Sequence, residues 1–161
     1  MKVVAIVQAR VGSTRLPNKV LKLIVGKPMI ELLLSRLSRS KEIDEIVVAT
    51  SEDVSNLPLV ELVRKLGYRC VQGSESDVLE RFISAGRVAQ ADIAVRITGD
   101  CPLIDPQLAD ECIRKFLNDG AEYLSNAAPP SFPDGLDTEV FRFAALEQAA
   151  RETERQYDRE H

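Results

Sequence analysis

Cationic, hydroxyl and glycine residues gather directly after the first apolar run of the sequence. The run VVAIV occupies residues 3–7, and the segment QARVGSTRLPNK follows it at residues 8–19. Glycine lets backbone N–H groups approach phosphate oxygens, hydroxyl groups donate hydrogen bonds, and cationic side chains neutralise phosphate charge. The segment therefore predicts a polyphosphate site of the kind that holds a nucleoside triphosphate. Its candidate residues are Arg10, Gly12, Ser13, Thr14, Arg15 and Lys19.

A solvated surface loop is the alternative interpretation of these cations, because Arg and Lys in loops rich in Gly, Ser and Pro are usually hydrated. Three cations in one strand-exit loop favour an anion site, since open α/β sheets bind ligands at the carboxyl ends of their strands. The segment has neither the Gly-Lys-Ser/Thr spacing of a Walker A motif nor the glycine spacing of a dinucleotide fingerprint. It predicts a different kind of nucleotide-binding loop.

A carboxylate follows a later apolar run in the same way. Residues 93–97 read IAVRI and lead into TGDCPL, which places Asp100 on a glycine-flanked turn. Carboxylate oxygens suit Mg²⁺, which takes one or two of them together with substrate phosphates. The alternative is a turn residue that bonds to its own backbone. Asp105 precedes Pro106, and this pair predicts a helix N-cap instead of a metal ligand.

A second group of carboxylates lies in the segment FPDGLDTEV at residues 132–140. Asp134 precedes Gly135, which is a turn signal. Asp137 alternates with Glu139, so in an extended segment both side chains would point to the same face. If that face borders a cleft, Asp137 completes a metal site with Asp100. If it is a solvent-facing strand edge, Asp137 has no such role, and the sequence leaves both alternatives open.

Short apolar runs alternate with segments of helical period along the chain, which predicts an α/β protein with a mostly parallel sheet covered on both faces. The loops at the carboxyl edge of that sheet would then carry the function. Helices are expected after Pro28, from 59 to Gly67, from 78 to 83, after Asp105 and from 144 to 150. Strands are expected at residues 3–7, 46–49, 93–97 and 138–141, with weaker candidates at 69–71 and 122–124.

Composition narrows the classes of function further. The chain has 161 residues and a net charge of −4 with interspersed signs, so we expect one domain, no nucleic-acid partner and no membrane association. The three cysteines show no CxxC spacing and the single histidine is the last residue, which argues against a structural zinc site. A soluble protein of the reducing cytoplasm is the predicted setting.

Taken together, these motifs resemble a known family. The segments QARVGSTRLPNK, GKPM, VRITGDCPLIDP and FPDGLDTEVF occur in this order, and they resemble the SpsF family of spore coat polysaccharide biosynthesis proteins. That family lies within the cytidylyltransferase group, which includes the CMP-sugar-acid synthetases. The resemblance covers nearly the whole chain. It implies the nucleotide-diphospho-sugar transferase fold, a Rossmann-like three-layer α/β sandwich.

The resemblance also implies roles for individual residues. The first loop would bind the triphosphate of CTP, Asp100 would bind Mg²⁺, and Asp137 would match a later acidic position, with Asp134 as its rival. Arg15, Lys19 and Asp100 would be the catalytic residues. The nucleotide-binding set would be Ala9, Arg10, Gly12, Ser13, Arg15 and Lys19, with Thr50, Ser76 and Arg81 as candidate base or ribose contacts.

Two departures from the family pattern affect these expectations. The chain ends at Glu160 and His161, whereas family members continue into segments that help to build the acceptor pocket and often a dimer contact. We therefore expect one nucleotidyltransferase-like domain over residues 1–161, shortened at its C-terminal end, and a homodimer as one possible assembly. Asn18 stands where the family usually has Gly, so the loop must turn there without the conformational freedom of Gly, although Asn tolerates left-handed conformations better than most residues.

The expected reaction is in-line transfer of CMP from CTP to a sugar or sugar acid, with release of pyrophosphate, in surface polysaccharide biosynthesis. Such a reaction depends on positioning and charge neutralisation more than on a covalent nucleophile. A glycosyltransferase that uses a nucleotide sugar is one alternative, although its usual Asp-x-Asp pair does not occur in the sequence. A nucleotide-binding module without turnover is the other.

Overall fold

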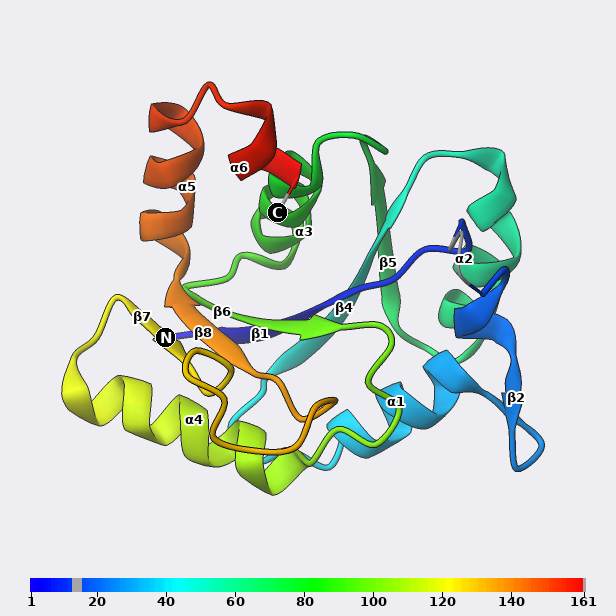
Figure 1. Cartoon of the computed structure of the whole chain (residues 1–161), viewed down its shortest axis with the longest axis horizontal. Coiled ribbons are helices and arrows are strands. Elements are labelled where there is room, and N and C mark those ends of the chain that lie inside the picture. Colours follow the sequence, from blue (N-terminus) through cyan, green and yellow to red (C-terminus); the bar gives the residue numbers. More distant parts are fainter. Residues whose placement is uncertain (13–15, 161) are drawn as a thin grey trace.

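A six-stranded sheet forms the centre of the protein in a computed structural model that describes residues 1–12 and 16–160 (Figure 1). The strand order is β5-β4-β1-β6-β8-β7, and β8 alone among these strands runs antiparallel to its neighbours. The expected mostly parallel sheet is thus confirmed. The strands, in sheet order, are β5 (Arg69–Gly73), β4 (Glu45–Ser51), β1 (Val3–Gln8), β6 (Ile93–Thr98), β8 (Glu139–Arg142) and β7 (Tyr123–Ser125).

The direction of β8 decides which loops share one edge of the sheet. Arg96 near the end of β6 pairs with Glu139 at the start of β8. The segment of residues 126–138, which enters β8, therefore lies at the same edge as the loops that leave β1, β4 and β6. This is the edge at which an open α/β sheet binds its ligands.

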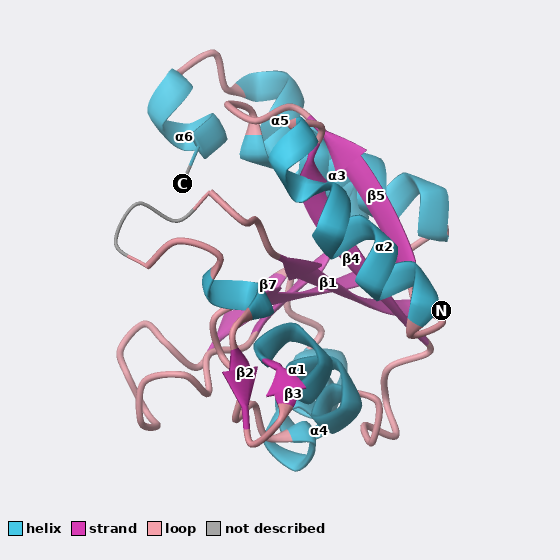
Figure 2. Ribbon diagram, turned by 90° about the vertical axis from the view of Figure 1, so that its right-hand side faces the viewer, coloured by secondary structure: helices cyan, strands magenta, loops and turns pink. Residues whose placement is uncertain are grey.

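Helices cover both faces of the sheet, because side chains on a strand alternate between faces. In β1, Val3, Ala5 and Val7 pack in one apolar core with residues of α1, α2 and α4, while Val4 and Ile6 pack in a second core with residues of α3 and α5. Figure 2 shows the sheet between α1 and α4 on one side and α3 and α5 on the other. The helices are α1 (Met29–Leu37), α2 (Leu57–Lys65), α3 (Val78–Ala89), α4 (Pro106–Asp119), α5 (Phe143–Glu152) and α6 (Gln156–Glu160).

The predicted elements are confirmed, with boundaries that differ by a few residues. The side chain of Asp105 accepts hydrogen bonds from the backbone N–H groups of Gln107 and Leu108, so the predicted N-cap of α4 is present. Short elements without a strong periodic signal were not predicted. They are the hairpin β2 (Leu23–Ile24) and β3 (Lys27–Pro28), the 3-10 helices η1 (Lys19–Leu21) and η2 (Val54–Asn56), and α6. Within the described residues, no helix combines the length and apolar character needed to cross a bilayer.

The turn of the hairpin between β2 and β3 carries a residue that does not suit its backbone. Val25 and Gly26 connect the strands with φ angles of 49° and 79°, and Val25 is 99% exposed. A β-branched residue is strained in the left-handed region, whereas Asn before Gly favours this kind of two-residue turn. We expect Val25→Asn to raise the free energy of unfolding by about 1 kcal/mol, measured by urea denaturation.

Val88→Asn is the matched control for this prediction. Val88 is also exposed, but it lies in α3, where its φ angle is not positive and where Val and Asn have similar helix propensities. This control should not stabilise the protein. An unchanged free energy of unfolding in Val25→Asn would contradict the proposed backbone strain.

Candidate functional site

A polar cavity of about 280 Å³ lies at the carboxyl ends of β1 and β6. It brings together Ala9, Arg10 and Lys19 from the first loop with Asp100 from the turn after β6, as the positions of the strands predicted. Ser13 and Arg15 lie outside the described residues, so their assignment stays a prediction. The cavity is lined by Gln8, Ala9, Arg10, Lys19, Val20, Arg96, Thr98, Gly99 and Asp100.

An ion pair between Lys19 and Asp100 connects the two loops across this cavity. The Nζ atom of Lys19 lies 2.9 Å from Oδ2 of Asp100, and half of the Asp100 side chain is exposed. Burial acts to raise the pKa of the Asp100 carboxyl, but the Lys19 ammonium and the hydrogen bond from Thr98 outweigh it and lower the pKa below its ordinary value. Asp100 is therefore ionised at neutral pH and able to bind a cation, while Lys19 presents positive charge to the same space.

Gly99 allows the two loops to approach this closely. Its backbone N–H donates to the carbonyl oxygen of Gln8 at 2.7 Å, and a Cβ atom at position 99 would lie 2.6 Å from that oxygen and 2.7 Å from Cβ of Ala9. A larger residue would push the Asp100 turn away from the first loop. A Cβ at Gly12, in contrast, would meet no atom of the described residues within 4 Å, so a role of Gly12 in nucleotide approach stays a prediction.

Asn18 has a left-handed backbone, with φ 56° and ψ 25°. Its backbone N–H donates to the carbonyl oxygen of Val11 at 3.3 Å, and its own carbonyl accepts from Leu21. The turn at Asn18 thus starts η1 and directs the chain to Lys19, the first residue of that helix. Asparagine tolerates this conformation better than most residues other than glycine.

Arg10 also has a carboxylate partner. Its Nη1 atom lies 3.0 Å from Oε1 of Glu75, which belongs to the segment between β5 and α3, and about half of each side chain is exposed. Both described cations of the first loop that line the cavity are therefore paired with carboxylates from other parts of the chain. A more strongly charged anion could compete for either cation, because exposed ion pairs of this kind are weak.

The three predicted base or ribose contacts lie outside the lining of the polar cavity. Arg81 is 2% exposed and donates from Nη1 to the carbonyl oxygen of Ser74 at 2.8 Å. Burial lowers the pKa of its guanidinium below the ordinary value, more than nearby Glu75 raises it. Thr50 is buried, and its Oγ1 has no hydrogen-bond partner in the described part of the chain, whereas Ser76 is exposed. Their contacts with a nucleotide stay predictions.

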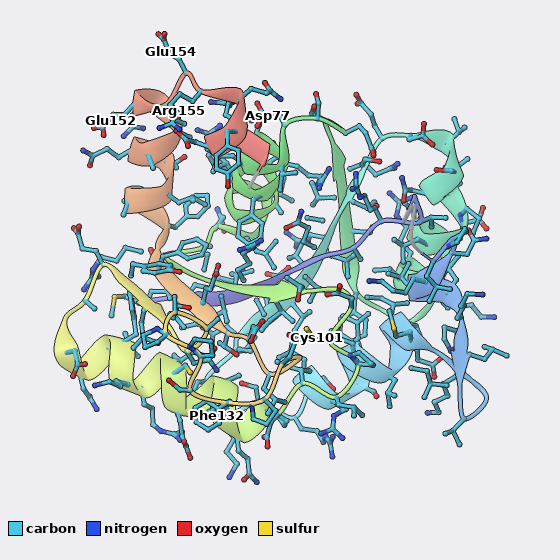
Figure 3. All side chains as sticks on the ribbon, in the orientation of Figure 1. Asp77, Cys101, Phe132, Glu152, Glu154 and Arg155 are labelled. Carbon is cyan, nitrogen blue, oxygen red and sulfur yellow. The ribbon has the colours of Figure 1, made fainter. Side chains whose placement is uncertain are left out.

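A second cavity, of about 590 Å³, lies on the other side of Asp100 and is lined by residues of the segments 98–103 and 133–137. Figure 3 shows Cys101 of the first segment beside the loop that carries Phe132. Burial raises the pKa of the Cys101 thiol above its ordinary value, and three nearby carboxylates raise it further. They belong to Asp100, Asp137 and Asp134.

The expected alternation of Asp137 with Glu139 was wrong, because β8 begins at Glu139 and Asp137 lies in the loop before it. Asp137 borders the same cavity as Asp100, whereas Glu139 pairs with Arg96 at 2.9 Å and borders a different one. Asp134 borders the Asp100 cavity as well. Among the described residues no cluster of three or more His, Cys, Asp or Glu side chains could hold a metal ion. Mg²⁺ binding by Asp100 and Asp137 stays a prediction.

Gln8 and Arg96 were not predicted as site residues, yet they border both the polar cavity and an apolar cavity of about 600 Å³ between α3, α5 and β8. The Oε1 atom of Gln8 is buried and has no hydrogen-bond partner within the described segments. Arg96 could have been identified from the sequence, because a charged residue is unusual inside an apolar strand run such as IAVRI. Gln8 had no such signal beyond its place at the end of the first strand.

Comparison of the sequence with protein families gives one match over most of the chain. The family described as cytidylyltransferase matches residues 4–161. An uncharacterised protein of Methanocaldococcus jannaschii, MJ1063, is 42% identical over 161 residues, which are 100% of this chain and 65% of that protein. The spore coat polysaccharide biosynthesis protein SpsF of Bacillus subtilis is 34% identical, over 97% of this chain and 69% of that protein.

Another relative, which matches a shorter part of this chain, has a substrate in its name. The 3-deoxy-manno-octulosonate cytidylyltransferase of Geobacter metallireducens is 35% identical over 75% of this chain, and the match spans 47% of that enzyme. This chain therefore spans between about half and about two thirds of the length of these three relatives.

Solved structures share the same fold. A cytidylyltransferase from Leptospira borgpetersenii superposes with a TM-score of 0.95 and 36% identity, covering 100% of this chain and 68% of that one. A CMP:2-keto-3-deoxy-manno-octonic acid synthetase complexed with CTP superposes with a TM-score of 0.77 and 22% identity, covering 96% of this chain and 80% of that one. The predicted nucleotide-diphospho-sugar transferase fold is thereby confirmed.

Proposed function

This chain belongs to the cytidylyltransferase family, and we propose that it transfers CMP from CTP to a sugar or sugar acid with release of pyrophosphate. The observation that carries the proposal is the polar cavity, which is lined by Arg10, by Lys19 and by the ionised carboxylate of Asp100. Nucleotidyl transfer requires cationic side chains that bind the triphosphate and a carboxylate that binds a metal ion, both in one site.

Arg10, Lys19 and Asp100 each have a task in an in-line displacement at this cavity. A hydroxyl oxygen of the acceptor attacks the α-phosphorus of CTP and loses its proton to water, and the bond to pyrophosphate breaks on the opposite side. Arg10 and Lys19 hold the β- and γ-phosphates and neutralise the charge that the leaving pyrophosphate gains. Ser13 and Arg15 add to this set by prediction from the sequence. No covalent intermediate with the protein is needed.

Asp100 suits Mg²⁺ as a ligand. It is a half-exposed, ionised carboxylate beside the phosphate-facing cations, and Asp134 and Asp137 border the adjoining cavity. Mg²⁺ often takes one or two protein carboxylates and completes its octahedral shell with water and phosphate oxygens. When bound there, the ion would neutralise phosphate charge and lower the pKa of the attacking hydroxyl.

The cavity of about 590 Å³ beside Asp100 is the proposed place of the acceptor. It adjoins the polar cavity through Thr98 and Asp100, so an acceptor there would lie next to the phosphates of CTP. The relatives SpsF and 3-deoxy-manno-octulosonate cytidylyltransferase support a sugar or a sugar acid as its class, in surface polysaccharide biosynthesis. A cytoplasmic setting and a homodimer belong to the same proposal.

Product analysis tests this function. The purified protein is incubated with Mg²⁺, one nucleoside triphosphate at a time and a panel of sugars and sugar acids that includes 3-deoxy-manno-octulosonate. We expect pyrophosphate and a CMP-sugar, detected by mass spectrometry, with CTP and not with UTP, ATP or GTP. Release of UDP, UMP or CMP from a nucleotide sugar would support a glycosyltransferase instead. CTP binding without any product across the panel would favour a non-catalytic module.

Glu75 should weaken CTP binding, because it pairs with Arg10 and places a negative charge near the triphosphate. We expect Glu75→Gln to bind CTP with Mg²⁺ a few-fold more tightly, by up to about fivefold, in isothermal titration calorimetry. Glu61→Gln, an exposed position on α2, is the control and should bind CTP as the unaltered protein does. Unchanged or weaker binding by Glu75→Gln would argue against Arg10 as a phosphate ligand.

A further inference from the structure

A buried asparagine holds the backbone of the first loop. Asn56 is the last residue of η2 and is 2% exposed. Its Oδ1 atom accepts a hydrogen bond from the backbone N–H of Val11 at 2.8 Å, although the two residues are 45 positions apart in the sequence. Val11 lies between Arg10 and Gly12, so this contact reaches the centre of the described phosphate-loop segment.

Asn56 is itself fixed to the end of β4. Its Nδ2 atom donates to Oγ of Ser51 at 2.7 Å, and its backbone N–H donates to the carbonyl oxygen of Asp53 at 2.9 Å. The side chain of Asp53 in turn accepts from the backbone N–H of Ser55 at 2.8 Å. Ser51 is fully buried. The amide of Asn56 therefore has little freedom to follow the loop if the loop moves.

Val11 is a point at which the two ends of the first loop meet. Its carbonyl oxygen accepts from the backbone N–H of Asn18, the residue before Lys19. Two residues earlier, the backbone N–H of Ala9 donates to the carbonyl oxygen of Ala49 in β4 at 3.1 Å. Holding Val11 therefore fixes the chain beside Arg10 and, through Asn18, beside Lys19.

An asparagine is suited to this place because one side chain must accept from a backbone N–H and donate to a hydroxyl oxygen. An apolar residue of similar size would leave a buried N–H of Val11 without a partner, which a folded protein avoids by moving the chain. Asn56 does not line the polar cavity, so its effect on a ligand there is indirect.

We propose that Asn56 is a positioning residue for the triphosphate of CTP. By holding the backbone of Val11, it keeps Arg10 and Lys19 at the separation that the β- and γ-phosphates require. The inference rests on the proposed function, since it assumes that CTP binds in the polar cavity. It extends the site to a residue of η2, an element that contributes no side chain to the lining.

Calorimetric titration of an Asn56→Leu variant with CTP and with CMP, each with Mg²⁺, tests the inference. We expect CTP binding to weaken about 10-fold, because an unpaired buried N–H makes the loop conformation less favourable. CMP has no β- or γ-phosphate, so its affinity should change far less. Asn118→Leu is the control, because it makes the same chemical change at an exposed position of α4 that does not line the polar cavity. This variant should bind CTP almost as the unaltered protein does.

The outcomes separate this inference from the function on which it rests. Equal CTP binding by Asn56→Leu and the unaltered protein would overturn the positioning role, as would equal losses for CTP and CMP. An unaltered protein that does not bind CTP would overturn the proposed function itself. If Asn56→Leu does not fold, amide hydrogen exchange of the unaltered protein replaces the titration as the test. Slow exchange at Val11 supports the contact, and exchange as fast as in an unfolded chain overturns the inference.

Discussion

Replacement of Asp100 by Asn should lower the rate of pyrophosphate release from CTP by at least about 100-fold, a loss comparable to that of a principal electrostatic group in other active sites. Asn has the shape of Asp and keeps one acceptor oxygen, but it removes the negative charge. The charge matters because Asp100 borders both the polar cavity and the proposed acceptor cavity. A metal ligand at that place would act on the phosphates and on the attacking hydroxyl together.

The pattern of kinetic constants should identify the cause. Without the carboxylate, Lys19 loses its partner and its full charge is available to the triphosphate, so KM for CTP should not rise together with the fall in kcat. The thermal stability should change little, since half of the Asp100 side chain is exposed and exposed ion pairs contribute little to stability. Steady-state pyrophosphate release and thermal unfolding measure the two effects.

Asp119→Asn is the matched control for this variant. Asp119 is the last residue of α4, pairs with Lys115 at 2.7 Å and is half exposed, so it offers the same chemical change away from the cavity. The Asp119→Asn variant should release pyrophosphate at the same rate as the unaltered protein. Normal turnover in Asp100→Asn would overturn the metal-ligand assignment, and a large fall in thermal stability would show a structural role instead.

Replacement of Lys19 by Met is the second change with a large expected effect. Met keeps most of the length and apolar surface of the side chain and removes the ammonium that faces the cavity. We expect kcat/KM for CTP to fall about 100-fold, because Lys19 would no longer neutralise the charge on the leaving pyrophosphate. Lys22→Met, an exposed position three residues later, should leave kcat/KM unchanged. Equal losses in the two variants would point to a general effect of charge.

The Lys19→Met variant should also change the pH dependence of kcat/KM. Lys19 is the main group that holds the pKa of Asp100 below its ordinary value, against the effect of burial. Its removal should raise that pKa, so the acid limb of the pH profile of kcat/KM should move to higher pH. An unmoved acid limb would show that Asp100 does not control it.

The lowered pKa of Asp100 also predicts how folding stability depends on pH. A carboxyl whose folded-state pKa is lowered stabilises the protein above its unfolded-state pKa, and this stabilisation is lost as the pH falls through the folded-state value. The Lys19→Met variant should therefore lose less stability on acidification than the unaltered protein. The difference should be small, because Asp100 is half exposed and solvent screens its interaction with Lys19.

Local patterns in the sequence determined the helices, the strands and the family. Apolar runs of strand length, helical stripes and the Asp105-Pro106 cap all depend on neighbouring residues, and the structure confirms them. The alternation of strands and helices also placed the loops with Lys19 and Asp100 at one edge of the sheet. The family follows from the same motifs and is confirmed by the match over residues 4–161.

Only the tertiary structure decided which side chains meet. The contact of Asn56 with Val11, the close approach of Gly99 to Gln8 and the pairing of Arg10 with Glu75 join segments far apart in the sequence, and no periodicity marks them. The loop position of Asp137 depends on where β8 begins, which sequence alternation did not show. Periodicity reports the average environment of a residue, whereas a site depends on the register and packing of particular strands.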